Sequence, residues 1–571
     1  MAVMEELGYQ PNLLHRGLVN KRSVVISIVI KHLSDLGFYG YSSVLFCTCT
    51  LGSHQKIIMK PRNLRVGKKR MHYFLAILPI LIVLCLMIFL RWGGQRAGPI
   101  GWAICALVAS LAFGLGWKVF WVSQVKGLLL SLNVLIVLWA ALYLYHLVNQ
   151  IGGVEAIALR LEELIADRGL LFLVLAWIFS AMIEGVAGFG MPIAIVAPML
   201  VALGVPPLVA VAAPAVGHTW AVTFGNMGLV IQALVAVTKI DARALAPDSA
   251  LLLGVACLTC GLGVAIILKQ LRRWPMIILL AVCMSAVQYF LAVVGLPGLG
   301  SFSAALVGII ICILLSRRSM ENLPPKPKTP ELTAALLFYG LAIAVIVLVA
   351  ILTPVNHVLS RLVLSYTFPQ VITRLGVATP AGPGQVFRPL LHPGVLIFLT
   401  TLISYPVLRF KNCILPGVWR QAAAATIRSA GMASIGIVSM VGLSTLMDHS
   451  GMTTLLAQGL SQTVGAAFPL FSPLVGMLGA FATGSNVNSN VLFAPLQQKI
   501  ALFLKINQVI LVSGQTAGGS LGSMISPAKL VVGCSTSKMK GHEGEVLRYT
   551  LPAGILIGLL VGVATWMIVR F

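Results

Sequence analysis

Charge is scarce in this chain, and acidic charge is the scarcest. Only 10% of the 571 residues are charged, and 15 Asp and Glu stand against 40 Lys and Arg. A soluble protein of this length would need far more charged surface to stay dissolved. The formal net charge of +25 would suggest nucleic-acid binding in a soluble domain, but the basic residues lie mainly between apolar runs. We therefore expect the lipid bilayer as a partner, and no nucleic acid.

Signatures of metal, redox and hydrolytic chemistry are also missing. The ten cysteines are scattered and suggest no disulfide framework. Cys257 and Cys260 have a metal-like spacing, but they lie in an apolar run without a nearby His or Asp, so we interpret them as one turn of an apolar helix. No nucleophile–base spacing or H-E-x-x-H cluster appears. We expect no cofactor, no metal and no enzymatic activity; an intramembrane enzyme is the alternative from another class.

Apolar residues make up 58% of the chain, and they come in long runs. The runs at 73–90, 251–268, 277–296, 332–352 and 551–569 each approach or exceed the ~20 residues that cross a bilayer as a helix. They lack the alternation that is typical of a β-barrel. We predict an all-α polytopic membrane protein with about 12–14 membrane segments, some of which need not cross fully.

Basic residues alternate between successive connections, as the positive-inside bias predicts. Lys269, Arg272 and Arg273 would be cytoplasmic, whereas the long connection 353–392 would lie outside. A proline-rich stretch at 323–330 looks like a linker. The predicted organisation is a first transmembrane half at 71–320, a linker at 321–331 and a second transmembrane half at 332–571.

Residues 1–70 differ in character from the rest and contain no run long enough to span a membrane. Residues 5–30 resemble a fragment of lactose-repressor-type transcription regulators, through the string ELGYQPN at 6–12 and the KRS at 21–23. The helix-turn-helix that would read DNA bases is missing. We expect residues 1–70 to be an extraneous or non-membrane leader, with the working protein starting near Met71.

Two polar, glycine-rich islands interrupt the apolar pattern. The first island comprises 184–192 (EGVAGFGMP) and 217–228, and the second comprises 483–490 (TGSNVNSN) and 514–527. A shift of 297 residues, which places Ala197-Pro198 on Ala494-Pro495, superposes the two islands without a gap. Corresponding interrupted segments in two halves indicate a transporter site near the membrane midplane. The alternative is that both islands are small-residue motifs for helix packing.

A helix broken in mid-membrane exposes backbone N–H groups, which are tolerated there only where they line a cavity or meet a ligand. The N-terminus of a half-helix offers such donors with a positive dipole end, which suits a carboxylate. We therefore predict that the islands bind a small organic anion, and that a neutral, donor-rich pocket favours a monocarboxylate. The candidate substrate-binding residues are Gly188, Phe189, Gly190, Thr219, Ser485, Asn486, Asn488, Ser489, Asn490, Gln515 and Thr516.

Three titratable side chains accompany the islands. Glu184 is the only carboxylate in the apolar run 170–186, where a charge costs roughly 2.5–3.5 kcal/mol, so it is the first candidate for proton coupling. The alternative is a structural carboxyl group bonded to the backbone. His218 is the second proton-coupling candidate, or a helix-packing histidine. Lys529 either balances the charge of the substrate or extends to the membrane interface.

From residue 73 to its end the chain resembles the lactate permease family. The resemblance is carried by FLAILP at 74–79, the two motifs EGVAGFGMP and TGSNVNSN, SGMT at 450–453 and MISP at 524–527. It implies two inverted repeats with broken or re-entrant helices, in a multi-pass protein of the bacterial inner membrane. It also implies symport of protons with lactate, glycolate or a related small 2-hydroxymonocarboxylate. A homo-oligomer is left open.

Two positions depart from the pattern of that family. Asn486 stands where its carriers have an acidic residue, and Ser523 stands where they have a lysine. Neither position can therefore contribute a charge to coupling or to carboxylate binding in this chain. The alternative is a sodium-coupled carboxylate or other organic-anion transporter, because unwound carbonyls and neutral side-chain oxygens also coordinate Na⁺.

Overall fold

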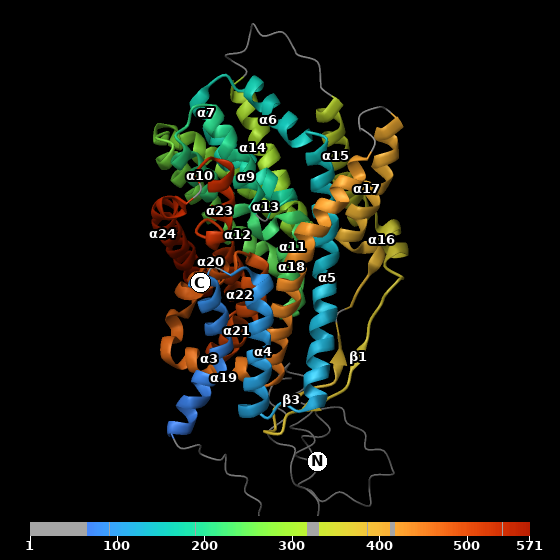
Figure 1. Ribbon diagram of the computed structural model, residues 1–571, viewed down its shortest axis with the longest axis vertical. Coiled ribbons are helices and arrows are strands. Elements are labelled where there is room, and N and C mark those ends of the chain that lie inside the picture. The colour runs from blue at the N-terminus through green and yellow to red at the C-terminus, as the bar shows by residue number, and fades with distance from the viewer. Residues whose placement is uncertain are drawn as a thin grey trace, which may run out of the picture. The chain divides into compact units, whose positions relative to one another are not determined.

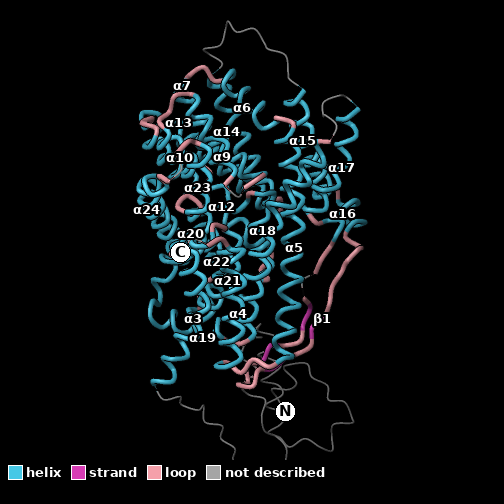
Figure 2. Tube along the Cα trace, viewed as in Figure 1, coloured by secondary structure: helices cyan, strands magenta, loops and turns pink. Residues whose placement is uncertain are grey.

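The structure is a computed structural model that describes residues 66–90, 92–188, 190–316, 330–384, 386–410, 417–539 and 541–570. Helices dominate the described residues, and the strands are short pieces of one connection (Figures 1 and 2). Val66–Phe571 forms one compact unit. The candidate site residue Phe189, residues 1–65 of the predicted leader and most of the predicted linker lie outside the described residues.

The first predicted half contains twelve described α-helices. In chain order they are α3 (Val66–Ile88), α4 (Gly94–Ala112), α5 (Trp117–Gln150), α6 (Gly153–Leu164), α7 (Arg168–Leu173), α8 (Ser180–Val186), α9 (Met191–Ala202), α10 (Pro207–Gly217), α11 (Leu229–Thr238), α12 (Ala242–Ile267), α13 (Trp274–Val294) and α14 (Gly300–Ser316). A π-helical turn, η2 (Val174–Phe179), joins α7 to α8, and the 3₁₀ turns η3 (Thr219–Phe224) and η4 (Asn226–Gly228) separate α10 from α11.

The second predicted half begins with α15 (Pro330–Ile351) and α16 (Thr353–Leu359). The connection that follows holds two antiparallel pairs, β1 (Thr367–Phe368) with β4 (Gly382–Pro383) and β2 (Val371–Ile372) with β3 (Ala378–Thr379). The remaining α-helices are α17 (Pro393–Phe410), α18 (Val418–His449), α19 (Met452–Val464), α20 (Phe468–Thr483), α21 (Asn486–Leu504), α22 (Gln508–Gly522), α23 (Pro527–Thr536) and α24 (Glu543–Arg570).

Ten helical segments of the described chain are long and apolar enough to cross a membrane, and four shorter apolar helices accompany them. Together they match the predicted 12–14 membrane segments. Large apolar side chains also lie on the outside, such as Phe89 (78% exposed), Leu111 (79%) and Phe290 (63%). Such a surface is stable only against lipid or a partner. The prediction of an all-α polytopic membrane protein is confirmed.

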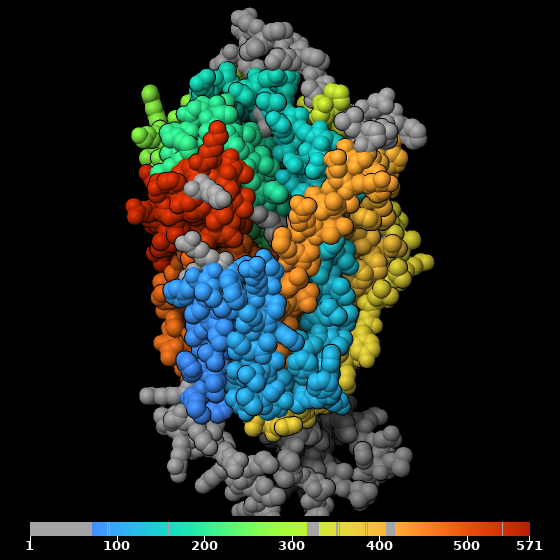
Figure 3. Space-filling model, in the orientation of Figure 1, coloured from blue at the N-terminus to red at the C-terminus, as the bar shows by residue number. Residues whose placement is uncertain are grey.

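The two longest helices, α5 and α18, pack along each other and against α4. The orange α18 runs beside the cyan α5 on the face shown in Figure 3. They contain 34 and 32 residues, which at 1.5 Å per residue gives each a length of about 50 Å. A bilayer core is about 30 Å thick, so each of these helices is longer than the core and either extends beyond it or crosses it at a tilt.

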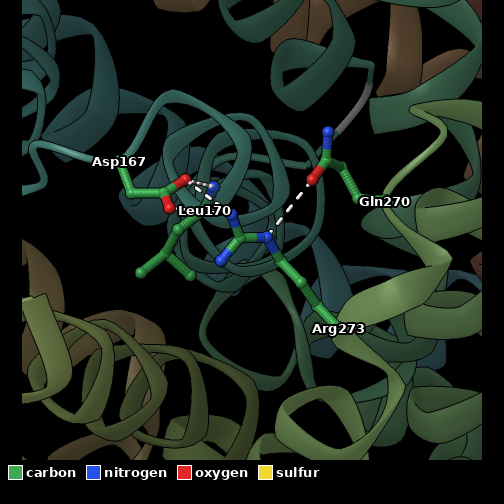
Figure 4. A network of polar contacts seen from close by, with 4 residues as sticks. All are labelled: Asp167, Leu170, Gln270 and Arg273. Atoms are coloured by element: carbon green, nitrogen blue, oxygen red, sulfur yellow. Dashed lines mark hydrogen bonds and ion pairs between the residues drawn. The ribbon is translucent and has the colours of Figure 1, made fainter.

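An ion pair ties together two connections at one end of the molecule (Figure 4). Asp167 begins α7 by accepting the Leu170 N–H at 2.9 Å, and Arg273 donates to both carboxylate oxygens at 2.7 and 2.8 Å. Burial alone would raise the pKa of Asp167, but these donors hold that pKa below its usual value. The predicted cytoplasmic residue Arg273 therefore lies beside the start of α7, which is expected on the same side.

The two polar islands break their helices at equivalent places. α8 ends at Val186 and α20 ends at Thr483, which are 297 residues apart, the same shift that superposes the sequences. The second break precedes α11 in the first half and α23 in the second. Both halves therefore have a hairpin of two helices with a break between them, followed by a second interrupted helix.

The interrupted helices pair crosswise between the halves. α9 contacts α23, and α11 contacts α21. A buried cluster that includes Ile193, Val211 and Leu530 joins α9, α10 and α23. Each half thus places its hairpin helix against the interrupted helix of the other half. Inverted repeats would produce this pairing, and the inverted relation itself stays a prediction.

Candidate functional site

The first break lies between α8 and α9 and depends on two glycines. Gly188 and Gly190 have left-handed backbone angles, with φ of +54° and +86°. A Cβ atom added to Gly188 would lie 2.1 Å from Nδ2 of Asn226, closer than any real contact. Gly188 is therefore required both by its conformation and by the approach of Asn226 from the second break.

The second break, between α10 and α11, is held in an unusual conformation. Asn226 and Met227 have φ of +50° and +53°, and Gly228 follows with +87°. Three consecutive left-handed residues, two of them not glycine, store backbone strain that the surrounding structure must hold. Asn226 and Met227 are also buried. Such strain clusters at ligand sites, which fits the prediction that this island is functional.

Substituting Gly188 tests the importance of the contact between the two breaks. We expect Gly188→Ala to abolish most of the transport activity, because its Cβ atom must displace Asn226. Gly204→Ala is the matched control, since Gly204 has φ of +90° but open space around it. Both variants pay the left-handed penalty of about 1–2 kcal/mol. Uptake rates and melting temperatures of the two variants distinguish the effect of the clash with Asn226 from the effect of the strained backbone. Equal uptake by both variants would contradict the importance of the contact between the two breaks.

In the second half, α21 and α23 also begin at breaks. Ser485 precedes α21 and accepts the N–H of Asn488 at 3.4 Å. Ser526 precedes α23, where no side chain caps the helix, and its buried hydroxyl has no hydrogen-bond partner among the described residues. The backbone N–H groups at this helix start and the Ser526 hydroxyl are therefore available to bind a ligand.

The starts of three of these half-helices converge. A Cβ atom on Gly190, before α9, would lie 3.6 Å from Cγ of Lys529 in α23. A Cβ atom on Gly484, before α21, would lie 3.3 Å from Cβ of Ala528 and 3.5 Å from Oγ of Ser526. The first turn of α23 therefore lies between the starts of α9 and α21. Three positive dipole ends at one place favour a bound anion.

Two buried charges of opposite sign lie at this convergence. Glu184 is 1% exposed and Lys529 is 5% exposed. Neither carboxyl oxygen of Glu184 accepts a hydrogen bond from the described residues. The structure thus buries both the candidate proton carrier and the candidate charge-balancing residue, and the described residues show no ion pair between the two.

His218 shares this environment. Its Nδ1 atom is 2.8 Å from the Pro214 carbonyl oxygen and therefore carries a proton, whereas the buried Nε2 atom has no partner in the described part of the chain. His218 also interacts electrostatically with Lys529. Whether it takes part in proton coupling or only in helix packing stays a prediction.

A cluster of neutral donors joins the two islands directly. The Thr223 N–H donates to Oγ of Ser520 at 2.9 Å, and their two hydroxyls are also 2.9 Å apart. Asn486 donates to the Thr516 carbonyl at 3.2 Å and to the Thr223 hydroxyl at 3.3 Å. Asn490 donates to the Thr516 hydroxyl at 2.9 Å. The side-chain oxygens of Asn486 and Asn490 receive no donor from the described residues.

Four other predicted residues contact neighbouring backbone or side chains outside this cluster. Thr219 donates to the Val216 carbonyl and lies 3.3 Å from Sγ of Cys260. Ser489 donates to the Gly476 carbonyl, and Gln515 donates to Ser489, so these two serve packing between helices. Asn488 points toward α4, with its Nδ2 atom 3.3 Å from a Cβ atom built on Gly94. Whether any of them meets a substrate stays a prediction.

Four functional candidates lie inside the predicted islands but were not among the named substrate-binding residues: Thr223, Asn226, Ser520 and Ser526. The sequence did carry a signal for two of them. Thr223 and Ser520 are separated by 297 residues, so the shift that superposes the islands also places Thr223 on Ser520. If the two halves are inverted repeats, as predicted, two equivalent positions that touch each other lie close to the axis that relates them.

Comparison with known proteins finds a family that matches most of the chain. The sequence model of the family described as L-lactate permease matches residues 72–571. Glycolate permease GlcA of Escherichia coli K12 is 28% identical over 532 residues, covering 86% of this chain and 94% of that protein. L-lactate permease of Bacillus subtilis 168 is 28% identical over 542 residues, covering 86% and 95%.

Two further similar proteins are a second L-lactate permease and a transporter of known structure. L-lactate permease of Escherichia coli K12 is 26% identical over 525 residues, covering 86% of this chain and 94% of that protein. The solved structure of the Alcanivorax borkumensis YdaH transporter covers 76% of this chain and 84% of its own, at 16% identity and a TM-score of 0.42. The family match begins at residue 72, and the resemblance of residues 5–30 to transcription regulators finds no support in these comparisons.

Proposed function

The chain belongs to the L-lactate permease family, and we propose that it takes up lactate, glycolate or a related small 2-hydroxymonocarboxylate together with protons. Its family and its apolar helices make it a multi-pass transport protein of the bacterial inner membrane, and not an enzyme. The names of its relatives, which include L-lactate and glycolate permeases, support the choice of cargo.

The observation that carries the proposal is the convergence of three half-helix starts on Lys529. The starts of α9, α21 and α23 supply backbone donors, and Lys529 supplies the one buried cation that the described residues place there. A single carboxylate matches this donor set, since a second negative charge would lack a counter-charge. The site therefore favours a monocarboxylate over a dicarboxylate.

The proposed coupling uses the opposite charges of Glu184 and Lys529, which are both buried. In the empty carrier the Glu184 carboxylate balances the charge of Lys529. When a substrate carboxylate takes that place, Glu184 binds a proton, so the net charge of the site is unchanged. A buried site that keeps its charge constant avoids the cost of moving an unpaired charge through the membrane. This arrangement gives one proton for each monocarboxylate.

The neutral cluster supplies contacts for the 2-hydroxyl group. Asn486 lies two residues after Gly484, which contacts Ser526 at the start of α23. Its unpaired side-chain oxygen can accept the hydroxyl proton of the substrate, and the hydroxyl of Thr223 or Ser520 can donate in return. A site that is built to bond a hydroxyl group rejects analogues that lack it, so propionate should compete poorly with lactate.

Purified protein in liposomes tests the proposal. With an inward proton gradient and no sodium, we expect uphill uptake of radiolabelled lactate and glycolate, weak competition by propionate and no uptake of a dicarboxylate. Movement of the dicarboxylate alone would overturn the monocarboxylate assignment. Empty liposomes provide the control for passive entry of the protonated acids.

Sodium coupling is the second candidate, and one observation favours it. The side-chain oxygens of Asn486, Asn488 and Asn490 have no donor among the described residues, and Na⁺ prefers such neutral oxygens. The same liposomes with an inward sodium gradient, at equal pH on both sides, separate the two ions. Uptake that requires sodium and does not depend on the proton gradient would show that sodium, and not the proton, is the coupling ion.

The division of the chain is part of the same proposal. We propose two transmembrane halves at 71–320 and 332–571, joined by a linker at 321–331 and preceded by a leader at 1–70. The equivalent breaks after α8 and α20, and their crosswise pairing, support two related halves.

A further inference from the structure

A cavity with several charged lining residues lies away from the helix breaks, and nothing above assigns it a role. It has a volume of about 280 Å³ and is lined by α5, α11, α18, α21 and the connection that carries β1 to β4. Its charged lining residues are Lys126, Lys239, Lys499 and Asp448, with His449 beside them. We call it the outer cavity. Its volume is close to the lower end of the range for small-molecule sites.

The outer cavity carries more positive than negative charge. Three lysines face one aspartate among its described lining residues. Asp448 is already engaged, because Lys499 donates to its carboxylate at 2.5 Å. His449 donates from Nδ1 to the Thr445 carbonyl, and its Nε2 atom accepts from Lys126 at 3.4 Å. This histidine is therefore neutral and leaves the charge of Lys126 in place.

The cavity is also connected with the central site. Lys499 lies in α21, which begins at Asn486, and Thr238 and Lys239 end α11, which begins directly after the second break. At 1.5 Å per residue the two helices place the outer cavity about 14–20 Å from the helix breaks. Thr379 and Gly384 line it from the connection 353–392, which the distribution of basic residues predicts to lie outside.

We propose that the outer cavity is a second binding site for small carboxylates, which captures the anion from the outside before it reaches the central site. The inference rests on the proposed function for the identity of the anion. Lysines in a partly enclosed cavity concentrate anions and raise their rate of arrival. The bound carboxylate accepts a hydrogen bond from Lys126, whose positive charge is not neutralised by His449.

Kinetics in oriented membrane vesicles test the capture step. The variant Lys126→Gln/Lys239→Asn removes two cavity charges, and asparagine suits the left-handed backbone of Lys239 (φ +61°). We expect KM for lactate to rise about tenfold at low ionic strength in right-side-out vesicles, with kcat unchanged. The difference should vanish at about 1 M salt, where charges are screened within ~3 Å.

The control variant Lys118→Gln/Lys505→Gln removes two exposed lysines of α5 and of the end of α21 that do not line the cavity. It should leave KM unchanged. Equal KM values for the two double variants, or a loss confined to kcat, would overturn the proposal. An equal rise of KM in inside-out vesicles would do the same, because the capture site faces one side.

Thiol labelling tests the cavity without relying on transport. Cysteine at Thr379 should react faster with a negatively charged methanethiosulfonate than with a positively charged one, and lactate should slow the reaction. Cysteine at the exposed Ile372 of the same connection should show neither effect, and the unsubstituted chain corrects for native cysteines. Absence of charge preference and of protection by lactate would refute the proposal. If the charge preference and the protection by lactate are both observed but liposomes transport no monocarboxylate, the proposed function is wrong and the anion-binding site is still supported.

Discussion

Replacing Glu184 with glutamine is expected to abolish uphill uptake of lactate while leaving exchange intact. Glutamine keeps the shape of the side chain, but it cannot release a proton and cannot balance Lys529 as a carboxylate. The loaded carrier still forms, because Glu184 is neutral in that state, so lactate can exchange for lactate. The empty carrier, however, has no carboxylate to balance Lys529, so its return across the membrane is hindered. The measurement is accumulation under a proton gradient, beside exchange of labelled for unlabelled lactate.

The matched control for this variant is Glu155→Gln, which changes an exposed carboxylate of α6. It should accumulate lactate like the unchanged protein. Uphill uptake that persists in Glu184→Gln would eliminate Glu184 as the proton carrier and leave His218 as the remaining predicted candidate. A loss of exchange together with accumulation would show that Glu184 is needed for structure or for substrate binding, and not for coupling.

Replacing Lys529 with methionine is expected to remove specific binding of the carboxylate. A charge-assisted hydrogen bond to a buried group is worth about 1.5–3 kcal/mol, so the affinity for lactate should fall roughly 10- to 150-fold. The affinity for lactamide, which has the same shape without the charge, should change little. Protection of the protein from thermal unfolding by each ligand measures both affinities.

The ratio of the two affinities is the informative quantity, because a general structural defect would weaken both ligands. Lys538→Met, which alters an exposed lysine beyond α23, provides the control. The double variant Glu184→Gln/Lys529→Met removes both charges and should fold more stably than Lys529→Met, which leaves Glu184 without a counter-charge. An unchanged preference for lactate over lactamide in Lys529→Met would contradict the assigned role.

The sequence was sufficient to locate the helix breaks. Gly188, Gly190 and Gly484 stand inside apolar runs, where a helix would otherwise continue, and all three have left-handed backbone angles in the structure. The 297-residue shift also predicted equivalent breaks. These features are local, because backbone conformation depends mainly on the residue itself and its neighbours along the chain.

The direction of individual side chains was harder to predict. Successive residues of a helix point about 100° apart, so a run such as Asn486 to Asn490 distributes its polar groups around the axis. Asn486 and Asn490 face the cluster around Thr223, whereas Asn488 faces α4. Ser526 was missed for a different reason: only the fold shows that the start of α23 lies beside the starts of α9 and α21.

The contact between Thr223 and Ser520 limits how this carrier can expose its cargo alternately to the two sides of the membrane. The hydrogen bonds among Thr223, Asn486, Thr516 and Ser520 join the two halves at the place where the substrate is expected to bind. Pulling the halves apart to open a path would destroy the binding site at the same moment. We therefore expect the interrupted segments of the two halves to stay joined while the carrier moves its cargo across the membrane.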